Sequence, residues 1–229
     1  MATFKTVMAF PMLATVVWLV WVLGQQTGID GVTALLAVLD VLLHRYTGQD
    51  DIAIGSPIAN RHRSETEPLI GFFVNTLVLR TDLSGDPDFL AVLAQTRSLA
   101  LAAYEHQDVP FEMLVEDLNP ARSLAHNPLF QIAFSMRNNE QPILELPGLA
   151  VAPLSKNEAE LAMFDLQLSA TEHDRGMRLS WLYARHLFDE ANIERLSAAY
   201  LRLLEGVLAA PEAPMSGLSL LGDGDAALI

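Results

Sequence analysis

The stretch YEHQDVPFEML, residues 104–114, places a histidine and a proline among carboxylates. His106 could act as a general base, since a neutral imidazole accepts a proton near neutral pH. It could equally lie at the carboxyl end of a helix, where a histidine bonds backbone carbonyls or Asp108. Pro110 disfavours helical backbone at the residue before it and can itself open a second helix. We therefore predict a structural corner between two helices, which needs no catalysis.

Other reactive side chains lack the spacing that their chemistry requires. Ser56 is not part of the Gly-x-Ser-x-Gly elbow of hydrolases. Residues 71–73 have no phosphate-binding spacing, and Glu112 and Glu116 fit a solvated helix face. No two of the six histidines have the helical spacing of metal ligands, and the chain has no cysteine, so no metal site is predicted.

The charge of the chain argues against a nucleic-acid partner. There are 14 Lys and Arg against 28 Asp and Glu, which gives a formal charge of −14. Nucleic-acid binders usually carry a basic patch, whereas the one basic cluster here is the short run at residues 61–63. Apolar residues make up 51% of the chain, which is enough for a core, and the lack of cysteine fits a cytoplasmic protein.

The first 29 residues form a hydrophobic N-terminal segment that differs from the rest. Residues 7–24 carry no charge, and their length is at the lower limit for a membrane-spanning helix. Pro11 weakens such a helix. Two alternatives stay open, a membrane anchor or an element buried in a larger core.

Helix and strand patterns alternate from Asp30 onward. Helices are predicted over 30–48, 88–107, 110–118 and 189–209, and strands over 51–59, 73–83, 129–138, 164–174 and 177–186. Asp30 and Asp86 are the predicted N-caps of the first two helices, and the pattern of the last two strands predicts a hairpin. The order predicts an α/β domain over residues 30–212, with a mixed sheet flanked by helices. The Pro- and Gly-rich residues 213–229 are expected to form a linker.

Four long stretches occur in a specific order: IGSPIANRHR (54–63), IGFFVNTLVLR (70–80), HQDVPFEMLVEDLNP (106–120) and NPLFQIAFSM (127–136). In sequence and order they resemble the C-terminal half of a condensation domain of nonribosomal peptide synthetases. The similarity continues through LFDEANIERL to the closing LSLL, which is similar to the start of a linker toward an adenylation domain, and it covers roughly residues 30–222.

The resemblance implies one lobe of a chloramphenicol-acetyltransferase-like two-lobe fold with a tunnel between the lobes. Carrier proteins would bring a donor acyl or peptidyl thioester and an acceptor aminoacyl thioester on phosphopantetheine arms, and the family joins them through an amide. The family's key histidine is the second one of a His-His-x-x-x-Asp-Gly motif in the first lobe, and no such motif occurs in this sequence. His106 is therefore not that histidine, and we expect the chain to be a truncated domain that is inactive alone.

Carried over residue by residue, the resemblance implies that Arg61, Asn75 and Asn127 line the cleft between the lobes, although loop and strand-end hydrogen bonding is an equal alternative. In His126 the sequence departs from the arginine that the family usually has. The remaining motif residues are expected to be structural: Gly71, His106, Asp108, Pro110, Glu112 and Pro128. No residue of this chain is expected to be catalytic or to bind a metal or cofactor directly.

The expected partners are carrier proteins, the other lobe and neighbouring synthetase domains. A noncatalytic module that docks a carrier protein or another synthetase module is an alternative, as is a membrane-tethered relic anchored by residues 7–24. The surface facing the other lobe should be apolar, so we expect the isolated chain to self-associate.

Overall fold

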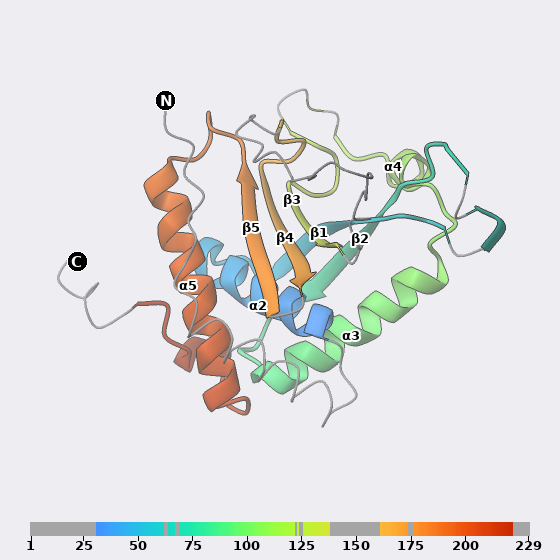
Figure 1. Ribbon diagram of the computed structural model, residues 1–229. Helices are drawn as coiled ribbons and strands as arrows, with labels where there is room; N and C mark the ends of the chain where they lie inside the picture. The colour runs from blue at the N-terminus through green and yellow to red at the C-terminus, as the bar shows by residue number, and fades with distance from the viewer. Residues whose placement is uncertain are drawn as a thin grey trace, which may run out of the picture.

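The computed structural model describes residues 31–61, 64–66, 69–121, 123, 126–137, 161–173 and 176–221 (Figure 1). The helices are α2 (Gly31–Thr47), α3 (Phe89–Glu105), α4 (Phe111–Leu118) and α5 (Glu190–Ala209), with 3-10 turns at Ser64–Thr66 and Met215–Gly217. The strands are β1 (Asp51–Ile58), β2 (Asn75–Asp82), β3 (Ile132–Arg137), β4 (Leu166–His173) and β5 (Gly176–Tyr183). Each predicted helix and strand is present, with ends within three residues of those predicted.

The five strands form one mixed sheet in the order β2-β1-β3-β4-β5. The pairs β1–β2 and β4–β5 are antiparallel, whereas β1–β3 and β3–β4 are parallel. The predicted α/β fold with a mixed sheet flanked by helices is therefore confirmed, as is the hairpin.

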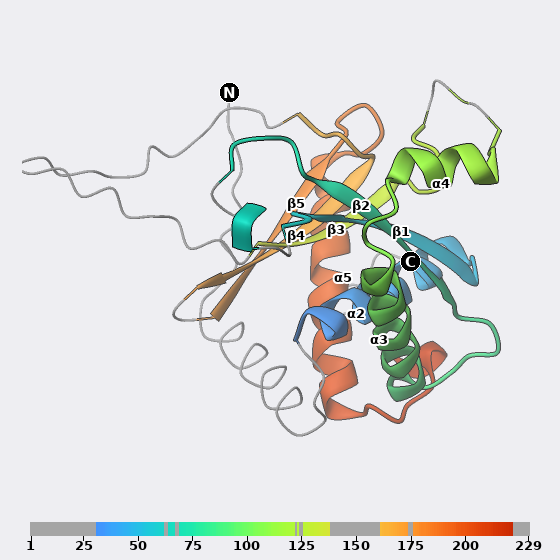
Figure 2. The same ribbon diagram turned by 90° about the vertical axis from the view of Figure 1, so that its right-hand side faces the viewer.

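Helices α2, α3 and α5 cover one face of the sheet, and α4 lies on the opposite face (Figure 2). Because side chains alternate along a strand, Ile52 and Ile54 of β1 point into the helical layer, as does Leu79 of β2. Helix α2 is buried at ten of its 17 positions, so it lies at the centre of the core. Helix α5 buries one apolar face that includes Tyr200, whose hydroxyl donates to the carbonyl of Leu35 at 2.8 Å.

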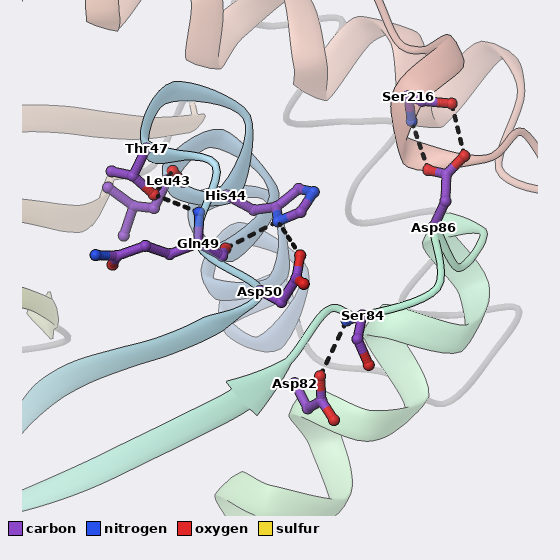
Figure 3. A network of polar contacts seen from close by, with 9 residues as sticks. All are labelled: Leu43, His44, Thr47, Gln49, Asp50, Asp82, Ser84, Asp86 and Ser216. Atoms are coloured by element: carbon purple, nitrogen blue, oxygen red, sulfur yellow. Dashed lines mark hydrogen bonds and ion pairs between the residues drawn. The ribbon is translucent and has the colours of Figure 1, made fainter.

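Helix α3 begins at a different cap from the one that the sequence predicts. Asp88, not Asp86, is the N-cap, and its carboxylate accepts the Ala91 N–H at 2.8 Å. Asp86 has a positive φ of 52° and accepts both the N–H and the hydroxyl of Ser216 (Figure 3). Both aspartates fit the capping pattern, and the long-range contact with Ser216 decides which of them caps the helix.

Residues 211–221, here named the C-terminal strap, dock against the helical layer. Met215 is 0% exposed and Leu218 is 4% exposed, and both belong to the core. The guanidinium of Arg45 on α2 donates to the carbonyl oxygens of both residues. The range 213–229, which the sequence predicts to be a linker, therefore begins with residues that belong to the core. Residues 222–229 lie outside the described residues, so a linker there stays a prediction.

Residues 1–30 lie outside the described residues. The predictions for the uncharged stretch 7–24 and for the N-cap Asp30 both fall in this range. None of the helices in the part that the structure describes is both long and apolar enough to cross a bilayer.

Candidate functional site

The four motif stretches contact one another around β1, β2 and the corner between α3 and α4. Four side chains join them, Arg61, Asn75, Phe111 and Phe130, and we name these four the motif cluster. Arg61 connects the first stretch to the second through its hydrogen bond to Gly71, and Asn75 connects the second to the third. The rings of Phe111 and Phe130 connect the third stretch to the fourth. The Phe130 ring also contacts Gly55 of β1, which belongs to the first stretch.

Arg61 fixes the loop that precedes β2. Its Nη1 atom donates to the carbonyl oxygens of Thr66 at 2.6 Å and Leu69 at 2.7 Å, and Nη2 donates to that of Gly71 at 3.4 Å. The guanidinium also lies 4.4 Å from the centre of the Phe73 ring, a cation–π contact. The strand begins at residue 75 rather than 73 because these contacts hold the preceding backbone in a loop.

Asn75 binds the α3–α4 corner to the start of β2. Its Nδ2 atom donates to the carbonyl oxygens of Gln107 and Val109, both at 2.8 Å, and its Oδ1 accepts the Phe111 N–H at 3.0 Å. Pro110 is the N-cap of α4 and supplies no side-chain hydrogen bond, so the cap comes from a different element. Both amide donors and the amide acceptor of Asn75 are used in this contact.

The corner has the predicted form, because α3 ends at Glu105 and α4 begins at Phe111. His106 is the C-cap of α3, and its carbonyl accepts the Val109 N–H at 3.0 Å. Asp108, Pro110 and Glu112 are exposed, and Glu112 lies in the first turn of α4, where a carboxylate is favoured. The side chain of His106 is exposed too.

Phe130 packs directly on the backbone of β1. It is 2% exposed, and its ring centre lies 5.6 Å from that of Phe111 and 5.4 Å from that of Phe164. A Cβ atom at Gly55 would lie 2.0 Å from the Phe130 Cε2 atom, well inside van der Waals contact. Only glycine fits at this position of the strand.

Asn127 and Pro128 orient the approach to β3. The Asn127 amide donates to the carbonyl of Met163 at 3.1 Å, which ties this stretch to the segment before β4. The Pro128 carbonyl accepts the Phe130 N–H at 2.8 Å across Leu129, whose φ is +67°. Such a conformation is strained for leucine, and the burial of the neighbouring Phe130 ring maintains it.

A groove of 540 Å³ lies beside the motif cluster, between α4 and strands β1 to β3. Its lining includes Leu114 and Leu118 of α4, Val78 of β2, and Leu43 and Thr47 from the last turns of α2. At its rim Arg80 donates two hydrogen bonds to Asp51, at 2.7 and 2.6 Å, and this guanidinium holds the pKa of the Asp51 carboxyl below its ordinary value. The pair is exposed, so it contributes little stability.

The described residues contain no group of three metal-ligating side chains. The Nδ1 atom of the exposed His126 lies 3.4 Å from the Asn127 carbonyl, and the part of the chain that the structure describes shows no partner for it beyond that. The structure thus brings Arg61, Asn75 and Asn127 into positioning contacts with backbone groups; whether they also line a cleft between lobes stays a prediction.

The sequence did not identify Phe111 and Phe130 as the residues that connect the motifs. The available signal was Gly55, because a glycine inside a strand pattern indicates close approach of another group. The identity of that group could not be read from the sequence, since Phe130 lies far along the chain.

Comparison with known proteins agrees with the family that the four motif stretches resemble. The family described as "Condensation domain" matches residues 13–229, so the match begins inside the uncharged stretch 7–24. A linear gramicidin synthase of Brevibacillus parabrevis is 44% identical over 200 residues, which are 87% of this chain and 3% of that protein.

Two solved structures have the same fold. The X-domain from teicoplanin biosynthesis has a TM-score of 0.83 and 31% identity, covering 92% of this chain and 48% of that one. The X-domain in the complex of the X-domain and OxyB from teicoplanin biosynthesis has a TM-score of 0.80 and 32% identity, covering 92% and 47%. The chain therefore spans about half of these structures and a small part of its curated relative.

Proposed function

Because the chain belongs to the condensation-domain family of nonribosomal peptide synthetases, we propose that it is the C-terminal lobe of a two-lobe condensation domain. In such a domain the amine of a carrier-bound aminoacyl group attacks a carrier-bound donor thioester. The new amide forms as the donor's thiol leaves. The proposed partners are the two carrier proteins, whose phosphopantetheine arms hold both substrates, and the lobe itself binds no cofactor.

The observation that carries this proposal is the alignment of nearly the whole chain with 48% of an X-domain chain. One lobe of two equal lobes would align in this way. The fold is of the chloramphenicol-acetyltransferase-like type in these neighbours, and the family match covers residues 13–229.

The loop before β2 supports the same proposal. Ile70 is 104% exposed and Phe72 is 91% exposed, although Arg61 holds the loop in one conformation. Water around a fixed apolar loop is unfavourable, and such a surface is typical of an interface. A second lobe packed there would bury both side chains without having to order the loop first.

The 229 residues hold no His-His-x-x-x-Asp-Gly motif, so another lobe must supply it. Amide formation also needs the two thioesters oriented between two walls, with polar groups fixed around the reacting atoms. We therefore propose that this polypeptide forms no amide by itself. Within the complete domain the motif cluster would hold the loop and the corner in place at the cleft.

The test is a fusion of the 229 residues behind an N-terminal lobe that carries an intact motif, assayed with loaded donor and acceptor carriers. Mass spectrometry should detect the amide product with the fusion. It should detect none with the chain alone, nor with a fusion in which the second motif histidine is replaced by alanine. Product from the chain alone, or no product from a folded fusion, would contradict the proposal.

A noncatalytic docking module is the second candidate, and one observation favours it. A structural neighbour, the X-domain, has been solved in complex with another protein, OxyB. On this hypothesis the chain binds a phosphopantetheinylated carrier, and a fusion with an intact first lobe binds that carrier but yields no amide. Calorimetric titration with holo- and apo-carrier, run beside the fusion assay, separates the two functions.

Two further proposals concern organisation. We place the end of the lobe at residue 221 rather than 212, because the C-terminal strap completes the core. A cytoplasmic location follows from the proposed partners, since carrier proteins and synthetases would have to meet this lobe in one compartment.

A further inference from the structure

The centre of the helical layer contains a carboxyl group that the proposed function does not use. Asp40 lies on α2, is 1% exposed, and is surrounded by the aliphatic core. Its Oδ2 atom accepts hydrogen bonds from the hydroxyls of Thr81 on β2, at 3.0 Å, and Thr96 on α3, at 3.3 Å. Both threonines are 1% exposed. The carboxyl group thus joins three elements at one buried point.

The second oxygen of this group, Oδ1, is buried and has no hydrogen-bond partner among the described residues. An ionised carboxylate in that position would leave a charge in the core without compensation, which costs far more than an unpaired neutral hydroxyl. Burial accordingly raises the pKa of Asp40 from its ordinary value of 3.8 to about 7, and the two threonine hydroxyls oppose part of that rise.

No charge on the described parts of the neighbouring elements compensates Asp40. Their titratable and charged side chains are exposed or bonded elsewhere: His44, Arg45 and Tyr46 on α2, Asp51 on β1, Arg80 and Asp82 on β2, Arg97, Tyr104 and Glu105 on α3, and Glu190, Glu194, Arg195, Tyr200, Arg202 and Glu205 on α5. The two threonine hydroxyls are the only polar side-chain partners that the described residues provide.

We propose that Asp40 is a proton-linked lock, which as a neutral acid holds α2 against β2 and α3 and on ionisation weakens that contact. The same two elements, β2 and α3, meet again where Asn75 binds the corner after α3. The lock therefore acts on β2, the strand that carries Asn75 of the motif cluster, and the proposal does not depend on the amide-forming function.

The sign of the pH dependence follows from the two pKa values. Below pH 3.8 the carboxyl is protonated in both the folded and the unfolded chain, so the full stability is present. Between 3.8 and about 7 only the unfolded chain releases the proton, so each pH unit lowers the folded-to-unfolded ratio by up to about tenfold. Above about 7 the loss is complete.

The test is urea unfolding of the full chain between about pH 5 and 9, for the wild type and for Asp40→Asn. The ratio of the two folding equilibrium constants should change by about tenfold per pH unit up to about pH 7 and then level off. Glu116→Gln, which removes an exposed carboxyl on α4, should leave the wild-type dependence intact. A wild-type to Asp40→Asn ratio that is constant over this range overturns the proposal.

A direct titration keeps the proposal testable if Asp40→Asn does not fold. Carbon-13 NMR of the side-chain carboxyl groups in the wild type should show one aspartate with a midpoint near 7, and Thr96→Val should move that midpoint upward, because it removes a hydrogen bond to the charged form. A wild-type midpoint near the ordinary value of 3.8, or no upward movement in Thr96→Val, overturns it.

Discussion

The helical layer and the motif cluster lie on opposite sides of the same strands and are held together differently. In the helical layer aliphatic side chains of α2, α5 and the C-terminal strap fill a common core. In the motif cluster each contact depends on one particular side chain. The Arg61 guanidinium bonds three backbone carbonyls, the Asn75 amide bonds the α3–α4 corner, and the Phe130 ring packs on Gly55. The helical layer should therefore tolerate exchange of similar residues, whereas the motif cluster depends on particular residue types.

The largest effect should come from the contact between the Phe130 ring and β1. Gly55→Ala places a Cβ atom 2.0 Å from the ring, so the ring or the strand must shift. We expect a loss of about 3 kcal/mol in the free energy of unfolding, at the upper end of overpacking costs. Chemical denaturation measures it.

The matched control for Gly55→Ala is the double variant with Phe130→Ala, which removes the clash along with the ring. The double variant should lose less free energy of unfolding than the sum of the two single losses, because without the ring the new Cβ atom no longer clashes. Additive losses would show that the ring does not press on β1.

A slightly smaller effect is expected in the helical layer, from the C-terminal strap. Met215→Ala leaves a cavity in the core and should cost about 2–3 kcal/mol by denaturant unfolding, if the strap is part of the domain. Ser216→Ala, at an exposed neighbour, should cost much less. If Met215→Ala is as mild as Ser216→Ala, the strap behaves as a linker and the domain ends before it.

The smallest effect on stability is expected at the exposed loop of the motif side. The double change Ile70→Ser and Phe72→Ser removes solvent-exposed apolar groups and should alter the free energy of unfolding by less than about 0.5 kcal/mol. Sedimentation velocity at micromolar concentration should nevertheless shift from self-associated species toward monomer. An unchanged distribution would mean that this loop is not the associating surface.

Much of the fold could be predicted from the sequence because its elements follow local patterns. The apolar period of α5 and the alternation along β4 each point to one element and one buried face. The N-cap of α3 was predicted wrongly, since Asp86 and Asp88 are locally equivalent and only the contact of Asp86 with Ser216 separates them.

The site was harder to predict than the fold because its contacts join residues distant in sequence. The resemblance pointed to Arg61 and Asn75, but nothing local indicates that Asn75 bonds residues more than 30 positions away. From the sequence alone, a polar residue in a motif fits a chemical role as well as it fits hydrogen bonding to the backbone. Only the structure shows which hydrogen bonds the residue makes.

Motif residues such as Asn75 hold the backbone of the corner, and amide hydrogen exchange at Phe111 is the sharpest test of this role. In Asn75→Ala the Phe111 N–H loses its acceptor, so its exchange should accelerate strongly, while amides of α2 and α5 keep their wild-type protection. Asn127→Ala, which leaves that bond intact, should not change Phe111. Unchanged exchange at Phe111 in Asn75→Ala would show that the Asn75 amide does not hold the corner.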